Sequence, residues 1–137
     1  MPFVRSLASK SDFSAGKLKK TFSNTDIGII QPMICFESIF PGFLNGHGKA
    51  NLLVNITNDF WFGDTNGPEQ HLALARQRSI ESGIPLVRVS NSGISAGYDP
   101  LGRELGRIEF GKTGFLDVKI PKKLSSTIYN RWGDKIF

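Results

Sequence analysis

One cysteine stands where an apolar run of this sequence ends, and a thiol in that place can serve as a nucleophile. Cys35 closes the run Ile27–Cys35, and Glu37 follows two residues later. Reactive groups in α/β sheets are often displayed where a strand ends. A free thiol is only slightly ionised at neutral pH, so a nucleophilic cysteine needs a base or a positive neighbour. Spacing alone leaves open a second interpretation, in which Cys35 is a small buried apolar residue.

A second group of polar and aromatic residues follows the next apolar run. The segment 55–64 reads Asn-Ile-Thr-Asn-Asp-Phe-Trp-Phe-Gly-Asp. Asn58 belongs to a residue type that makes turn hydrogen bonds at the end of a strand. Residues 60–62 are three successive aromatics in a polar loop, and they suit either core packing or the mouth of an apolar substrate site. The sequence leaves both interpretations open.

The inventory of ionisable residues excludes several functions. One cysteine excludes an internal disulfide and a multi-cysteine metal site, and His47 and His71 lack the spacing of metal ligands. We therefore expect no metal and no cofactor, and both histidines at the surface or in helix packing.

The net charge of the chain is +5, but its lysines do not alternate with aromatics, so we expect no binding to nucleic acid. A basic face toward a membrane is compatible with this charge. Arg78 is expected on an exposed or partly exposed helix face, paired with Glu81.

The elements that must position these residues alternate between strands and helices. Apolar runs predict strands over 27–35, 50–58, 85–89, 94–98, 104–109 and 114–120, with a short helix at 41–44 and a longer one over 68–82 that ends at Gly83. Pro32 removes a backbone donor from the first strand and so predicts an edge or a bulge there. Residues 99–103 form a Pro-x-Gly turn. This order predicts an α/β fold, a mixed sheet with covering helices.

Several segments together resemble the nitrilase, or carbon–nitrogen hydrolase, superfamily. They are Ile34–Glu37, Leu53–Gly63, Ala75–Glu81, Pro85–Gly93 and Asp99–Arg103. Three further segments, Trp61–Asp64, Gly67–His71 and Tyr129–Asp134, resemble the apolipoprotein N-acyltransferases of bacteria in particular. The resemblance covers most of residues 27–137 and favours Cys35 as the nucleophile.

The resemblance implies the C-terminal half of a nitrilase-type α-β-β-α sandwich. Residues 1–26 would be a polar arm or the remnant of a preceding segment, residues 27–121 a partial nitrilase-like domain, and residues 122–137 a C-terminal tail. The location implied is the periplasmic face of the bacterial inner membrane. The chain itself contains neither a run of about twenty apolar residues nor a stretch typical of a signal peptide.

The activity implied by the resemblance is a two-step acyl transfer. Cys35 would take an acyl chain from a phospholipid as a thioester, and the N-terminal diacylglyceryl-cysteine of a lipoprotein would then accept it. Glu37 matches a second acid near the family's nucleophile, and Trp61 and Phe62 match residues near its lipid-binding mouth. Asn58 and Phe36 are expected to support the site. Phe36 stands where the family commonly has tyrosine, which removes one hydroxyl.

The family's general base, a glutamate, and its oxyanion-stabilising lysine have no matching positions in this chain. We therefore expect the chain to be inactive alone, with a companion chain supplying both groups, and poorly stable because sheet edges remain open. Two other functions stay open. One is a nitrilase-type amidase that hydrolyses a C–N bond, and the other is a non-catalytic binding module in which Cys35 is inert.

Overall fold

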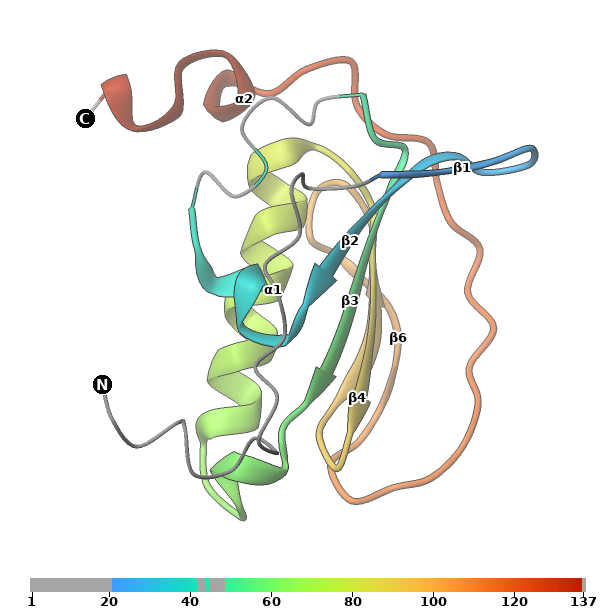
Figure 1. Ribbon diagram of the computed structural model, residues 1–137, viewed down its shortest axis with the longest axis vertical. Coiled ribbons are helices and arrows are strands. Elements are labelled where there is room, and N and C mark those ends of the chain that lie inside the picture. The colour runs from blue at the N-terminus through green and yellow to red at the C-terminus, as the bar shows by residue number, and fades with distance from the viewer. Residues whose placement is uncertain (1–20, 42–43, 45–48, 137) are drawn as a thin grey trace, which may run out of the picture.

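The computed structural model describes residues 21–41, 44 and 49–136, and within them the strands form one sheet in the order β1-β2-β3-β4-β5-β6 (Figure 1). The strands are β1 Phe22–Asn24, β2 Gly28–Ile34, β3 Leu52–Asn58, β4 Leu86–Asn91, β5 Ser95–Tyr98 and β6 Glu104–Ile108. β2, β3 and β4 are parallel, whereas β1, β5 and β6 pair antiparallel to their neighbours. The sheet is therefore mixed, as the sequence predicts.

Helix α1, Gly67–Ser82, covers one face of the sheet (Figure 1). It begins one residue before the predicted start at Pro68 and ends at Gly83, whose left-handed backbone (φ 67°) was expected from the sequence. The small side chains of Ala75, Ser79 and Ser82 in α1 are buried, and their size lets the helix approach the sheet closely. The core between the two consists mainly of Met33, Leu53, Leu72, Ala75, Leu86, Ile94 and Ala96.

The C-terminal segment closes the end of α1. Groups before and within its short helix α2, Ile128–Trp132, donate to carbonyls at the C-terminal end of α1, where a helix leaves carbonyls without an internal partner. Leu124 N donates to the Gly83 carbonyl over 2.8 Å, and Asn130 Nδ2 donates to the Ser82 carbonyl over 3.1 Å. Thr127 Oγ1 donates to the carbonyl of Glu81. The described part of the segment expected as a C-terminal tail, residues 122–136, thus caps α1.

The segment 114–120 differs from the sequence prediction, because it is irregular rather than a strand. Its apolar side chains pack on glycines of the sheet: a Cβ added to Gly97 would lie 3.1 Å from Val118, and one added to Gly106 would lie 3.0 Å from Leu116. These glycines leave room for the segment to cross the face of β5 and β6. The segment therefore contacts the sheet through Leu116 and Val118 and does not pair beside β6, and Phe115 stays 91% exposed.

The N-terminal half differs from the sequence prediction at β1 and η2 and agrees with it at Pro32. Residues 1–20, most of the predicted arm, lie outside the described residues, and β1 forms where the sequence predicts loop. A short 3-10 helix, η2 (Cys35–Ile39), directly follows β2, whereas the helix predicted at 41–44 falls largely on residues that are not described. Pro32 lies beyond the last β1 partner, which is Ile30, so the expected edge position is confirmed.

The sheet face turned away from α1 carries an apolar row. Ile34, Ile56 and Val89 are side by side in the register of β2, β3 and β4, and each is more than half exposed. Side chains of successive strand residues point to opposite faces, so this row lies opposite the buried residues that face α1. We call these three residues the open sheet face. No described helix is long and apolar enough to cross a membrane.

Candidate active site

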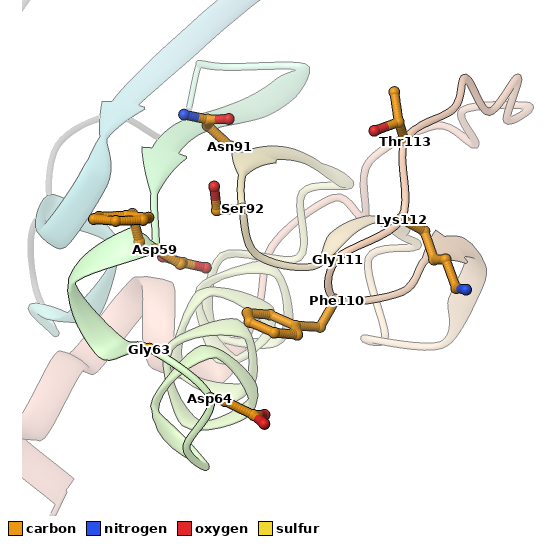
Figure 2. A pocket seen from close by; sticks show the side chains of 10 residues that line it. Asp59, Gly63, Asp64, Asn91, Ser92, Phe110, Gly111, Lys112 and Thr113 are labelled. Atoms are coloured by element: carbon orange, nitrogen blue, oxygen red, sulfur yellow. The ribbon is translucent and has the colours of Figure 1, made fainter.

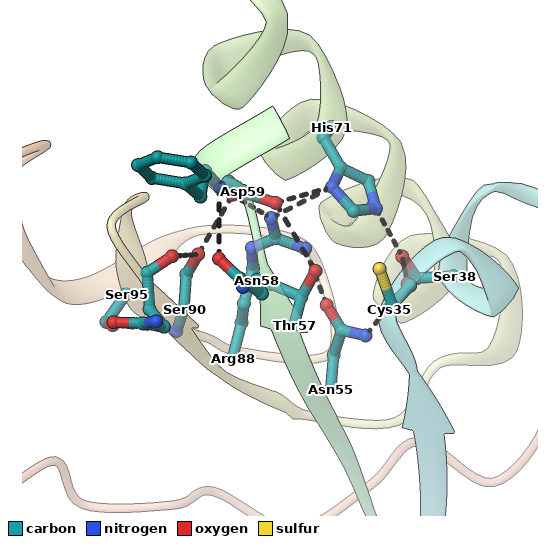
Figure 3. A network of polar contacts seen from close by, with 12 residues as sticks. Cys35, Ser38, Asn55, Thr57, Asn58, Asp59, His71, Arg88, Ser90 and Ser95 are labelled. Carbon is teal, nitrogen blue, oxygen red and sulfur yellow. Dashed lines mark hydrogen bonds and ion pairs between the residues drawn. The ribbon is translucent and has the colours of Figure 1, made fainter. Parts of the chain in front are cut away.

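The carboxyl ends of β3 and β4 border a cavity of about 480 Å³ (Figure 2). Its walls come from the loop after β3, the β4–β5 turn and the turn at 110–113. Asp59 and Phe110 lie on its wall, and the Lys112 side chain extends away from Asp59 (Figure 2). Cys35 does not line this cavity; it lies on the other side of Asp59, at the end of β2 (Figure 3).

Cys35 occupies a strained backbone position as the first residue of η2, directly after β2. Its φ is 49°, in the left-handed region that residues with a side chain rarely adopt. Such a conformation costs roughly 1–3 kcal/mol and persists only where the surrounding structure holds it. The thiol is free and half-buried. The fold therefore displays Cys35 at the C-terminal end of a parallel strand, where sequence analysis placed it.

Hydrogen bonds hold the backbone on both sides of Cys35. The Glu37 carboxylate accepts from Ile34 N over 2.7 Å and so spans the cysteine. Ser38 Oγ donates to the Cys35 carbonyl over 3.1 Å. Asn55 Nδ2 donates to the same carbonyl over 3.3 Å and to the Met33 carbonyl over 3.0 Å. Glu37 thus lies beside Cys35, and its carboxylate is engaged with backbone.

Behind Asn55 lies a buried ion pair between Arg88 and Asp59 (Figure 3). Arg88 Nη1 donates to Asn55 Oδ1 over 2.5 Å, and Arg88 Nη2 donates to Asp59 Oδ2 over 2.6 Å. His71 Nδ1 lies 2.9 Å from Asp59 Oδ1, and Ser90 Oγ donates to Asp59 Oδ2 over 3.0 Å. The side chains of Arg88 and Asp59 are fully buried, so each charge depends on the other.

The electrostatic balance keeps Asp59 ionised. Burial alone would raise the pKa of Asp59, but the charge of Arg88 and hydrogen bonds from His71, Ser90 and Arg88 bring this pKa below its usual value. Burial lowers the pKa of Arg88, and Asp59 and then Cys35 oppose that change. Cys35 is thus within electrostatic range of the Arg88 guanidinium.

The aromatic residues named by the sequence divide into two groups. Phe36 and Phe62 contact the His71 ring, with centroids 5.8 and 5.6 Å from it. Trp61 is 72% exposed and carries its ring away from the core. Asn58 makes a turn, because its Oδ1 accepts from Phe60 N over 3.1 Å. That Trp61 and Phe62 meet lipid stays a prediction.

Sequence analysis did not anticipate the ionic network behind Cys35. The expectation of an exposed or partly exposed Arg78 is wrong, because this side chain is buried and its Nη1 donates to the Ile39 carbonyl. The expected pair of Arg78 with Glu81 is confirmed, at 2.7 Å. His71 packs from the helix, one of the two expected settings. No function was expected of Arg88 from the sequence, although a charged residue inside the apolar strand 85–89 itself indicates a buried partner. Among the described residues no cluster of His, Cys, Asp and Glu suits a metal ion.

Known proteins resemble this chain in sequence. It is 46% identical over 107 residues to an apolipoprotein N-acyltransferase of Rickettsia bellii, an alignment that covers 77% of this chain and 21% of the relative. It is 44% identical over 126 residues to an apolipoprotein N-acyltransferase of Bradyrhizobium diazoefficiens, which covers 91% of this chain and 24% of that relative. The chain therefore spans about a quarter of the length of the curated relatives it matches.

Solved structures and a family model agree on the fold. The NitN amidase of Nesterenkonia sp. AN1 superposes with a TM-score of 0.62 at 22% identity, over 80% of this chain and 45% of the amidase. A carbon–nitrogen hydrolase of Helicobacter pylori G27 superposes with a TM-score of 0.61 at 20% identity, over 74% of this chain and 43% of that chain. The predicted nitrilase-type α/β fold is confirmed. The family model described as carbon–nitrogen hydrolase matches residues 3–129, and this chain therefore belongs to the carbon–nitrogen hydrolase family.

Proposed function

We propose that this chain is the cysteine-bearing part of an apolipoprotein N-acyltransferase, in which Cys35 carries the acyl group. The observation that carries the proposal is the half-buried Cys35 thiol at the C-terminal end of β2, in a chain 46% identical to such an enzyme. A thiolate is strongly nucleophilic, and the thioester it forms readily passes its acyl group to an amine.

The proposed reaction has two steps. Cys35 Sγ attacks the carbonyl carbon of a phospholipid acyl ester, the ester C–O bond breaks, and the lysophospholipid leaves as an alcohol after taking a proton. The α-amine of a lipoprotein's N-terminal diacylglyceryl-cysteine then attacks the thioester, the C–S bond breaks, and the thiol is restored. Neither step changes an oxidation state, so the proposal invokes no redox cofactor.

The residues around Cys35 have distinct parts in this proposal. Glu37 keeps the backbone on both sides of Cys35 in place through its bond to Ile34 N. Phe36 and Phe62 cover His71 with apolar rings, and the exposed Trp61 ring meets the acyl chains of the lipid. Asn58 fixes the turn that presents these aromatics.

A companion part is proposed to supply the general base and the oxyanion-stabilising cation. Acyl transfer needs both groups, and the absence of one member of such a set lowers the rate by orders of magnitude. The apolar row of the open sheet face supports this proposal, because an exposed apolar patch marks a surface that another element covers. The NitN amidase, of which this chain aligns to 45%, has further chain to provide such a layer.

The proposed setting is a membrane surface, the periplasmic face of the bacterial inner membrane, where phospholipid and lipoprotein meet. The net charge of +5 is compatible with it, because anionic lipid attracts basic surfaces. No contact with nucleic acid is part of the proposal.

The test is the intact mass of the protein after incubation with phospholipid micelles. Two proteins are compared. One is this chain alone, and the other is the Bradyrhizobium relative in which the aligned segment is replaced by this chain, which we call the exchanged protein. We expect a gain of one acyl group in the exchanged protein, no gain in its Cys35→Ala variant, and none in the chain alone. A folded exchanged protein that forms no adduct contradicts the proposal. Hydrolysis of simple amides would instead indicate an amidase, and an unreactive Cys35 with stable partner binding would indicate a binding module.

A further inference from the structure

Two side chains from different elements donate to one carbonyl oxygen, that of Cys35 (Figure 3). Ser38 Oγ comes from η2 and lies 3.1 Å away, whereas Asn55 Nδ2 comes from β3 and lies 3.3 Å away. Cys35 has a left-handed φ of 49°, which an unconstrained cysteine leaves for a commoner conformation. The carbonyl is therefore a point at which the strained residue is held from two directions.

The same two donors are joined to each other behind the cysteine. Asn55 Oδ1 accepts from Arg88, Arg88 donates to Asp59, and Asp59 pairs with His71. His71 Nε2 completes the connection at 3.4 Å from Ser38 Oγ. The result is a closed circuit, which we call the Cys35 ring. Its members are Cys35, Ser38, His71, Asp59, Arg88 and Asn55.

The hydrogen-bond acceptors of the Cys35 ring indicate which of its atoms donate. An ionised carboxylate only accepts, so the His71 nitrogen nearest Asp59, Nδ1, carries a proton. The Ser38 hydroxyl has one proton and lies between the Cys35 carbonyl and His71 Nε2. Ser38 donates this proton to the Cys35 carbonyl, which is the nearer of the two groups at 3.1 Å against 3.4 Å for Nε2.

Burial makes the Cys35 ring a firm constraint. The side chains behind Cys35 belong to residues that are at most 3% exposed, so water does not compete for their hydrogen bonds. Hydrogen bonds strengthen in such surroundings, and an unmatched group is costly there. The members come from η2, β3 and the turn after it, α1 and β4, so four parts of the fold converge on one cysteine.

We propose that Asn55 and Ser38 are positioning residues for Cys35, and that Arg88, Asp59 and His71 hold these two in register. The ring fixes the left-handed backbone of Cys35 and with it the direction of the thiol. This inference rests on the proposed function for its catalytic consequence, namely that Sγ reaches an acyl carbonyl in one orientation. The constraint on the backbone itself does not depend on that function.

Hydrogen exchange on the whole chain tests the constraint. Asn55→Asp keeps an acceptor for Arg88 but loses the donor to Cys35, and Ser38→Ala opens the ring on the other side. We expect each to raise exchange of the amides of residues 34–40 about tenfold, the effect of one unmade buried hydrogen bond, with the amides of residues 72–82 unchanged. Ser38→Thr keeps the hydroxyl and should restore protection.

The matched control is Ser79→Ala, which removes a buried hydroxyl that donates to the carbonyls of Ile84 and Asp99, far along α1. It should leave residues 34–40 unchanged. Equal exchange in all three variants, or a uniform rise across the chain, would overturn the positioning role. If Asn55→Asp does not fold, Ser38→Ala decides alone.

The catalytic consequence is measured in the exchanged protein described above. Ser38→Ala should lower kcat for Cys35 acylation by roughly 10- to 100-fold at unchanged KM, since a small misplacement of a reacting group has that effect. A change in KM alone overturns the catalytic part. If the unsubstituted exchanged protein forms no thioester, the proposed function fails, and the exchange data still decide whether the ring holds Cys35.

Discussion

Arg88 Nη2 lies 2.6 Å from Asp59 Oδ2, and both side chains are fully excluded from solvent. Arg88 comes from the middle of β4 and Asp59 from the turn after β3, so the pair locks two neighbouring parallel strands where they present the site. A buried pair of this kind contributes little compared with an apolar pair, but either member alone is a buried, unmatched charge. Its first role is therefore to fix geometry.

Removal of the cation should destabilise the fold strongly. Arg88→Met leaves the buried Asp59 carboxylate without its cationic partner, and we expect the free energy of unfolding to fall by about 3–5 kcal/mol. Urea unfolding followed by circular dichroism measures the change. Arg107→Met is the control, because Arg107 pairs with partly exposed carboxylates such as Glu69, and exposed pairs contribute about 0–1 kcal/mol. Equal losses in the two variants would contradict the importance assigned to the buried pair.

The pH dependence of stability should change when Asp59 is neutralised. The folded pKa of Asp59 is below its unfolded value, so this carboxylate stabilises the fold above the unfolded pKa of about 3.9, and its contribution is lost as the pH falls through the folded pKa. Asp59→Asn should therefore be less stable at neutral pH and show a flatter loss between neutral and acid pH. Thermal unfolding from about pH 2 to 7 measures this, with the exposed Asp64→Asn as control. Parallel curves for Asp59→Asn and the unsubstituted chain would refute it.

The strain at Cys35 predicts an unusual order of stability. Glycine adopts a φ of 49° without penalty, whereas alanine does not. The free energy of unfolding of Cys35→Gly should therefore exceed that of Cys35→Ala by on the order of 1 kcal/mol, with a higher urea midpoint. At Ser95, the first residue of β5 and paired with Ile108 of β6, the order should reverse, because glycine weakens a strand. Urea midpoints of the four variants decide the matter, and alanine at least as stable as glycine at position 35 would show that no strain is stored there.

The cap on α1 can be tested at a glycine. Gly83 and Gly111 have similar φ values of 67° and 69°, but a Cβ on Gly83 would lie 2.8 Å from Thr127, whereas Gly111 has nothing within 4 Å. Gly111→Ala should cost about 1–2 kcal/mol from the backbone alone. Gly83→Ala should cost more, because it also displaces the segment that caps α1. Thermal unfolding compares them, and equal losses would mean that the segment yields freely.

The open sheet face should matter for assembly and little for the chain alone. Ile56→Glu replaces an exposed residue, so the free energy of unfolding of the chain should change by no more than about 0.5 kcal/mol. In the exchanged protein the same substitution should prevent stable folding, because a charge would be buried between the sheets. Leu74→Glu, on the exposed side of α1, is the matched control. Normal yield and melting of the exchanged Ile56→Glu protein would show that nothing covers this face.

The sequence by itself determined the order of the main elements and the place of Cys35. Apolar runs predicted β2, β3, β4, β5 and β6, and Pro68 with Gly83 marked the limits of α1 to within one residue. These features are local, because periodicity, helix caps and turn residues act within a few positions. The segment 114–120 misled the same reasoning, since an apolar run has the same pattern whether it pairs in a sheet or crosses its face.

Only the tertiary structure decided what surrounds the cysteine. Asn55, His71 and Arg88 lie 20 to 53 positions from Cys35 in the sequence, and no spacing rule joins them. They meet because the register of β2, β3 and β4 places Met33, Asn55 and Arg88 side by side, and because α1 returns His71 over that row. Strand pairing and helix packing are long-range interactions, so the buried charges that hold Cys35 found their partners only in the folded chain.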